Sequence, residues 1–298
     1  MHYYADTDNK QKTFELGQIF EQTILQWQKL NPHTSYDVEL AQCYSCVLAA
    51  APKNYGVCAE LAERAETLLA ALHQTYDNRP FDDNYYDAIC HFSVVLSTYY
   101  IDRYRKGDDT YYKKGLRYIK ESLDGLFARY PYDPEYIEHS LSQPFHNRAF
   151  LYAKNGEWDK AISNYKSALK KRRIVYEKYL DDKDLFEVAQ TCVNIGDAYR
   201  IAKKFNKALE YAEEALDIYS SKRNENQEVF EMFYYEAYQL KATILMDIDV
   251  SNGKVPDIPL SMMEECMKWS NSHPINDYAD RFNGVSGIIL QSYKHKKK

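Results

Sequence analysis

The sequence predicts an all-α protein, an α-solenoid of stacked helix-turn-helix repeats. Two segments of the 298-residue chain, residues 145–169 and 192–216, can be laid over each other without a gap. Apolar residues in both segments recur at the helical period. The chain also has only 10 Gly and 9 Pro, which argues against a β-rich fold. An internal repeat of this size is typical of solenoids, whose units bury their apolar faces against one another.

The two segments match position by position, and corresponding residues stand 47 apart, as Ala161 and Ala208 do. Small residues at the shared positions let two antiparallel helices approach closely, and large residues fill the space between them. The first segment supplies Asn147, Ala149, Tyr152, Trp158, Lys160, Ala161, Ile162, Ala168 and Leu169. The second supplies Asn194, Gly196, Tyr199, Phe205, Lys207, Ala208, Leu209, Ala215 and Leu216. Short polar breaks at 154–157 and 203–204 are predicted to join the two helices of each unit.

This pattern resembles the tetratricopeptide (TPR) repeat, a helix-turn-helix unit, most clearly over residues 142–219. The spacing of 47 exceeds the roughly 34 residues of a standard repeat, so longer helices are expected. The chain is similar in this respect to kinesin light chains and to the TPR domains of bacterial peptide receptors. The resemblance implies a right-handed superhelix with a concave groove lined by the first helix of each pair.

Residues 1–35 are predicted to form an N-terminal capping helix. A helix over 11–30 has apolar residues on one side and is stopped by Asn31-Pro32. The predicted apolar side consists of Phe14, Ile19, Phe20, Ile24, Leu25 and Trp27. An alternative is that this helix pairs with a partner protein, or with a second copy of the chain. Pairing with a second copy would make the protein a homodimer.

Residues 36–271 are predicted to form about five TPR-like helix pairs. A small residue recurs at Cys58, Gly115, Ala161 and Ala208, once in each of the first four pairs. The expected helices outside the two matched segments are 36–51, 55–78, 83–105, 109–129, 226–249 and 259–270. The third pair should follow a break at Pro131 to Pro134, where we also expect a hinge. Residues 272–298 should contain a C-terminal capping helix over 276–293 and a basic tail, although that helix can also be read as half of a sixth pair.

Composition narrows the function. The net charge of −6 gives no general attraction to nucleic acid, and no apolar run is long enough to span a membrane. The start of the sequence is polar, without a secretory signal. Six Cys in that setting are expected to be reduced thiols in a cytoplasmic protein.

Chemical motifs are sparse. Cys43 and Cys46 form a CxxC that, with Cys58, Cys90 and His91, offers zinc ligands in principle. The CxxC falls within a predicted helix, which favours packing over metal binding. A zinc hydrolase remains the alternative, but the sequence shows no catalytic signature, so we expect no enzyme and no cofactor. The basic run 170–173 is interpreted as a solvated helix face.

The most specific functional signal is the pair Asn147 and Asn194, at equivalent places in two first helices. In the families that this chain resembles, an Asn there binds the backbone of an extended peptide, and an amide both donates and accepts hydrogen bonds. The alternative is that both are polar residues tolerated on an exposed face. The predicted groove residues are Gln143, Asn147, Phe150, Lys154, Gln190, Asn194, Asp197 and Arg200.

The sequence therefore predicts a non-catalytic TPR scaffold or adaptor that binds a protein or peptide in the concave groove. The alternative is the ligand-sensing module of a bacterial signalling or defence system. A sensor needs two conformations with different affinities for its ligand.

Overall fold

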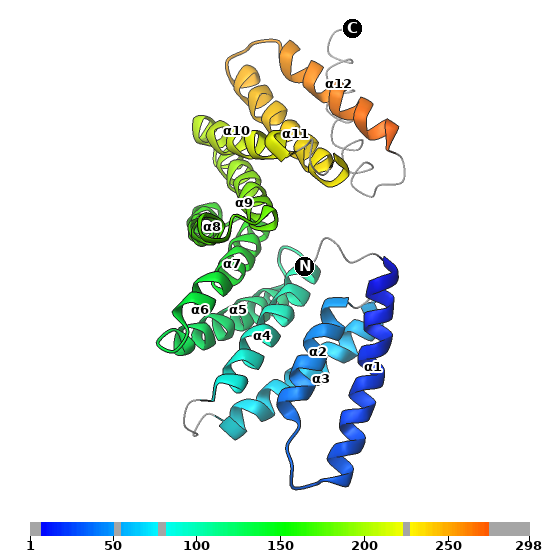
Figure 1. The fold of residues 1–298 in the computed structure, drawn as a ribbon. Coiled ribbons are helices and arrows are strands. Elements are labelled where there is room, and N and C mark those ends of the chain that lie inside the picture. The colour runs from blue at the N-terminus through cyan, green and yellow to red at the C-terminus, as the bar shows by residue number, and fades with distance from the viewer. Residues whose placement is uncertain (1–6, 51–54, 77–81, 223–226, 274–298) are drawn as a thin grey trace. The chain divides into compact units, whose positions relative to one another are not determined.

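A computed structural model describes residues 7–50, 55–76, 82–222 and 227–273 of the chain. All regular structure in these residues is helical, and they contain no strand, which confirms the all-α prediction (Figure 1). The chain divides into two compact units, residues 1–156 and 157–298, which are described separately. Within each unit successive helices pack against one another, as expected of helical repeats.

The helices begin and end close to their predicted bounds. Those of the first unit are α1 (Thr7–Leu30), α2 (Asp37–Ala50), α3 (Tyr55–Tyr76), α4 (Asp83–Arg103), α5 (Asp109–Arg129), α6 (Pro134–Ser140) and α7 (Ser142–Asn155). Those of the second unit are α8 (Trp158–Tyr179), α9 (Asp182–Ile201), α10 (Phe205–Lys222), α11 (Gln227–Ser251) and α12 (Asp257–Ser272). The predicted helix over 276–293 lies outside the described residues.

Local chemistry accounts for several helix ends. Asp82, Asp108 and Asp181 each precede a helix, and their carboxylates accept hydrogen bonds from backbone N–H groups of its first turn. The turn between α7 and α8 contains Gly156 at φ 85°, a left-handed conformation that glycine adopts without strain.

The short helix α6 was not predicted. Asp133 caps it by accepting from the Tyr136 N–H, and Pro134 occupies its first turn, where a missing N–H costs nothing. The sequence predicted a break in the helix here, and the structure has one: α5 ends at Arg129 and α6 begins at Pro134. The hinge expected at this turn stays a prediction.

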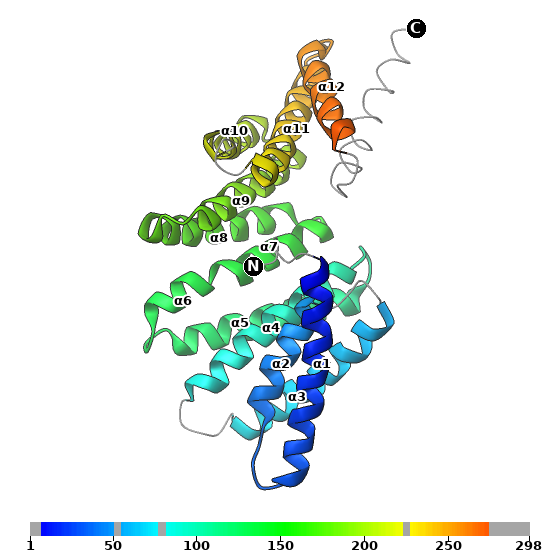
Figure 2. The same ribbon diagram turned by 45° about the vertical axis from the view of Figure 1, so that its right-hand side comes forward.

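In the first unit, α1 runs alongside α2, α2 contacts α3 and α4, and α4 packs along α5 (Figure 2). Helix α7 then lies on both α4 and α5. Two apolar clusters fill the unit, one among α1 to α5 and one among α4 to α7. Their largest fully buried side chains include Tyr104, Tyr118, Phe92, Ile119 and Ile137.

The predicted apolar side of α1 was partly wrong. Phe14 and Ile24 are buried, but Ile19, Phe20 and Trp27 are 62%, 48% and 47% exposed. The face of α1 that packs on α2 also carries Gly17, which lies against Val47, and the buried carboxylate of Glu21.

Glu21 is 3% exposed, and its carboxylate accepts from Tyr44 Oη and Arg64 Nη1, each at 2.6 Å. A polar residue thus occupies the centre of the α1 interface, which a hydrophobic pattern does not reveal. Pairing of α1 with a partner or a second copy stays a prediction.

A second carboxylate organises the first unit in the same way. Glu66 of α3 accepts from Tyr100 Oη at 2.6 Å and Tyr118 Oη at 2.8 Å, and pairs with Lys114 Nζ at 2.9 Å. Burial and the hydrogen bond to this carboxylate raise the pKa of Tyr100 and of Tyr118. These tyrosines connect the buried core to a charge at its edge.

In the second unit α9 packs on α8 and α10, α10 on α11, and α11 on α12. The matched small residues lie in the helix interfaces: Ala161, Ala168, Ala208 and Ala215 are fully buried. At Gly196 a Cβ atom would lie 3.2 Å from the Ala208 carbonyl oxygen. The close approach predicted from the small residues is therefore present between α9 and α10.

The pairing of helices departs from the simple repeat at one place. The boundary between the two units falls after Gly156, so α7 and α8, the predicted third pair, belong to different units. Within its own unit α8 packs on α9.

Candidate functional site

The predicted groove residues fall on two helices, one in each unit. Gln143, Asn147, Phe150 and Lys154 lie on α7 of the first unit. Gln190, Asn194, Asp197 and Arg200 lie on α9 of the second.

Asn147 joins α7 to α4. Its side chain is 6% exposed, and its Nδ2 donates to Ser97 Oγ and to Thr98 Oγ1, both at 3.1 Å. Its Oδ1 accepts from Gln143 Nε2 at 2.9 Å. The amide nitrogen of Asn147 is thus engaged inside the protein, and a ligand could accept from it only after one of these hydrogen bonds had broken.

The end of α7 makes a second polar connection to α4. Lys154 Nζ donates to the Ile101 carbonyl oxygen at 2.6 Å and lies 5.6 Å from the centre of the Phe150 ring. Burial lowers the pKa of this amine. Phe150 itself is 39% exposed, so it offers an apolar contact on the outer side of α7.

Asn194 is in a different environment from Asn147. It is half-buried on α9, and its side chain makes no hydrogen bond with any other residue that the structure describes. Gln190 and Asp197 stand four and three positions away, so they share its helix face. The Asn194 amide is therefore free to donate to, and accept from, a bound molecule.

Next to Asn194, one arginine connects two carboxylates. Arg200 Nε donates to Asp197 Oδ1 and Nη1 donates to Asp247 Oδ2 of α11, both at 3.0 Å. The three side chains together carry one negative charge. A ligand carboxylate would have to displace one of these partners to reach Arg200, which the sequence alone did not indicate.

Sequence reasoning missed three members of these networks, Ser97, Thr98 and Asp247. The two hydroxyl residues look like ordinary helix residues, and their partner is about fifty positions away in the chain. A polar residue inside an apolar helix pattern was the available signal. It does not identify the partner, because that depends on which helices pack together.

The described cysteines other than Cys46 are core residues. Cys43 and Cys90 are buried, and burial raises their pKa values to about 11 and about 12. Cys46 is exposed, and the side chain of Cys58 lies outside the described residues. In the described part of the chain, no three His, Cys, Asp or Glu side chains gather closely enough to hold a metal ion.

None of the described helices combines the length and the apolar character needed to cross a membrane.

The packed helices and the internal repeat define an α-helical repeat protein that presents helix faces to its surroundings. The tetratricopeptide repeat family model matches residues 140–221. Residues 140–221 thus match the tetratricopeptide repeat, and the fold around them is all-helical. Repeats of this type are in general non-catalytic scaffolds for protein interaction.

A solved structure supports the fold over most of the chain. The crystal structure of BtubC (BKLC) from P. vanneervenii is similar with a TM-score of 0.58 and 14% sequence identity. The likeness covers 93% of this chain and 92% of that one. No curated protein matches the chain in sequence.

Proposed function

We propose that this protein is a non-catalytic scaffold or adaptor that binds an extended peptide segment of a partner protein. The match to TPR repeats supports protein interaction in general, and the Asn194 amide on α9 is the proposed contact with the peptide. The ligand backbone pairs with the Asn194 side chain, which has both a donor and an acceptor unused by the described residues. This free amide, on a helix face shared with Gln190 and Asp197, is the observation that carries the proposal.

The residues on α7 belong to the first unit and are not part of the proposed contact. Asn147 holds α7 against α4, and Phe150 is exposed on that helix. Lys154 donates to the Ile101 carbonyl oxygen, so we do not assign it a contact with a charged group of the ligand. The free cysteines among the described residues suit a cytoplasmic location, which belongs to the same proposal.

The test starts from peptides selected from a random library on the purified full chain. Their affinities are then compared for the wild type and Asn194→Ala. We expect Asn194→Ala to lower the affinity for the selected peptides by about tenfold, since two hydrogen bonds of about 0.5–1 kcal/mol each are lost.

Asn206→Ala is the matched control, because Asn206 is an exposed asparagine on α10 outside the proposed surface. It should bind like the wild type. If every selected peptide binds Asn194→Ala and the wild type equally well, the proposed role of this surface is wrong.

A further inference from the structure

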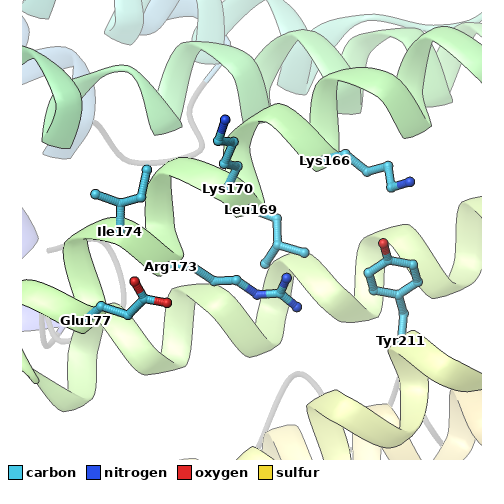
Figure 3. Close-up of a pocket in the computed structure, with 7 residues that line it drawn as sticks. All are labelled: Lys166, Leu169, Lys170, Arg173, Ile174, Glu177 and Tyr211. Atoms are coloured by element: carbon cyan, nitrogen blue, oxygen red, sulfur yellow. The ribbon is translucent and has the colours of Figure 1, made fainter.

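A separate hollow lies in the second unit, over α8 and α10. Its volume is about 270 Å³, and it opens to solvent. None of the residues that line it belongs to the predicted groove. The lining residues are Lys166, Leu169, Lys170, Arg173, Ile174, Glu177 and Tyr211 (Figure 3).

Positive charge dominates this hollow. Lys166 and Lys170 are exposed, and neither forms an ion pair with an acid in the described part of the chain. Glu177 is the single acidic residue in the lining. Two ammonium groups therefore remain uncompensated beside the hollow.

Arg173 is positioned by an acid outside the lining. Its Nη2 binds Glu214 Oε1 at 2.5 Å, which holds the guanidinium in place, while the Arg173 side chain stays 45% exposed. In Figure 3 the side chains of Arg173 and Lys166 extend toward Tyr211, whereas Lys170 extends away from it. Arg173, Lys166 and the Tyr211 hydroxyl thus converge on one side of the hollow.

Two tyrosine rings lie close to the lysine ammonium groups near Tyr211. The rings of Tyr199 and Tyr211 are stacked with their centres 5.8 Å apart. Lys166 Nζ and Lys207 Nζ lie 6.0 Å and 5.7 Å from the centre of the Tyr199 ring. The neighbouring Tyr199 hydroxyl raises the pKa of Lys166 above its ordinary value, so the positive form of this amine is favoured further.

Apolar surface accompanies the charge. Leu169 and Ile174 both line the hollow, and Ile174 is 42% exposed. A free inorganic ion would leave this surface uncovered. A nucleic acid would require a longer positive track than the hollow provides, and the whole chain carries a charge of −6. A peptide side chain next to an acidic group covers both parts.

We propose that this hollow binds an oxyanion, a carboxylate or a phosphoryl group, carried by a peptide segment of a partner protein next to an apolar residue. Arg173 and Lys166 donate to the anionic oxygens, and an N–H fork beside a point charge suits both kinds of group. The Tyr211 hydroxyl donates a further hydrogen bond, and the apolar residue of the ligand covers Leu169 and Ile174. This site is distinct from the proposed peptide contact at Asn194.

Three fluorescently labelled peptides with one leucine-containing sequence test the proposal on the full chain. One carries two glutamates, the second has a phosphoserine in place of one glutamate, and the third has glutamines in both positions. Fluorescence anisotropy should show at least one charged peptide binding about tenfold more tightly than the glutamine peptide, with an affinity that falls as salt rises. The tighter of the two charged peptides identifies the anionic group.

Variants then locate the site. Lys166→Glu and Arg173→Gln should each weaken the charged peptide by about tenfold, since each removes a charge-assisted contact. Lys254→Glu, on an exposed loop of the same unit, and Asn194→Ala should both bind like the wild type. Lys166 is exposed and makes no ion pair with a described residue, so its substitution should leave the fold intact. Arg173→Gln loses the contact with Glu214 and can also lower stability. The Lys166→Glu result can be interpreted without that complication.

The proposal is overturned if neither charged peptide binds better than the glutamine peptide. It is equally overturned if Lys166→Glu binds the charged peptide as the wild type does. Unchanged binding to Asn194→Ala separates this site from the proposed one on α9.

Discussion

Two asparagines at matched positions of the repeat have opposite environments. Asn147 is buried and bonded to Ser97, Thr98 and Gln143, whereas the Asn194 amide bonds to no other described residue. The repeat therefore preserves the position of the side chain and not its role. The neighbouring helix decides which of the two amides is available to a ligand.

The two asparagines should differ in what their removal does to stability. Asn147→Ala should lower the free energy of unfolding by about 1–3 kcal/mol, because Ser97 and Thr98 lose a buried partner. Asn194→Ala should change it by no more than about 0.5 kcal/mol. Urea unfolding followed by circular dichroism measures both, and equal effects would contradict the assigned roles.

The carboxylate of Asp87 should make stability depend on acid. Its pKa is lowered to about 2 by hydrogen bonding to His91, with further contributions from Tyr136 and Arg129. Because the unfolded chain has the ordinary pKa of 3.8, it takes up the proton first as the pH falls. The stabilisation is present above that pH and is lost as the pH falls toward 2.

Asp87→Asn tests this dependence. Near neutral pH the variant should be less stable than the wild type by about 1–2 kcal/mol, a value reduced for the partial exposure of the site. The difference should shrink between about pH 5 and pH 2. Urea titrations at several pH values measure it, and a difference that stays constant through this range would rule out Asp87 as the group responsible.

At the scale of one element, α1 has a buried face and an exposed apolar face. Phe14 lies in the core, whereas Phe20, six residues later, is 48% exposed. Phe14→Ala should cost about 3 kcal/mol of stability, and Phe20→Ala no more than about 0.5 kcal/mol. The same substitution at both sites makes the pair its own control, and denaturant unfolding of a dilute sample compares them. A large loss at Phe20 would mean that another surface covers this face in solution.

The sequence could predict the helices but not every face that they bury. Helix periodicity, the Asp residues before helices and the small residues of the repeat together gave bounds close to those observed. Periodicity assigned Phe20 to the apolar side of α1, because it cannot register that Glu21 is buried by Tyr44 and Arg64. Polar networks formed by distant segments are the part that a local pattern leaves out.

At the scale of the whole molecule, the same limit applies to the candidate site. The pattern located α7 and α9 and their asparagines. It did not show that Asp197 and Asp247 already share Arg200, or that Ser97 and Thr98 hold Asn147. Each of these depends on which helices are neighbours, and that follows from the packing of the whole unit.

Contacts between successive helices also predict how far along the chain a destabilising substitution affects the helices. A valine at Gly196 would crowd the Ala208 backbone, and overpacking of this kind costs about 1–3 kcal/mol. Because repeat units contact mainly their neighbours, hydrogen exchange should speed up across α9 to α11 and stay unchanged in α1 to α5. Exchange measured by mass spectrometry tests this, with Ser220→Val on the exposed side of α10 as the control. Faster exchange throughout the chain would show that the protein unfolds as one cooperative body.

The tyrosine hydroxyls that donate to Glu21 and Glu66 should be detectable by ultraviolet absorption. Ionisation of a phenol changes its ultraviolet absorption, and Tyr44, Tyr100 and Tyr118 each donate to a glutamate that opposes a second negative charge. In a titration with base, part of the absorbance of the 29 tyrosines should therefore rise late, together with the loss of helical circular dichroism. Glu66→Gln should bring forward the ionisation of two phenols, and an unchanged curve would show that this carboxylate does not control them.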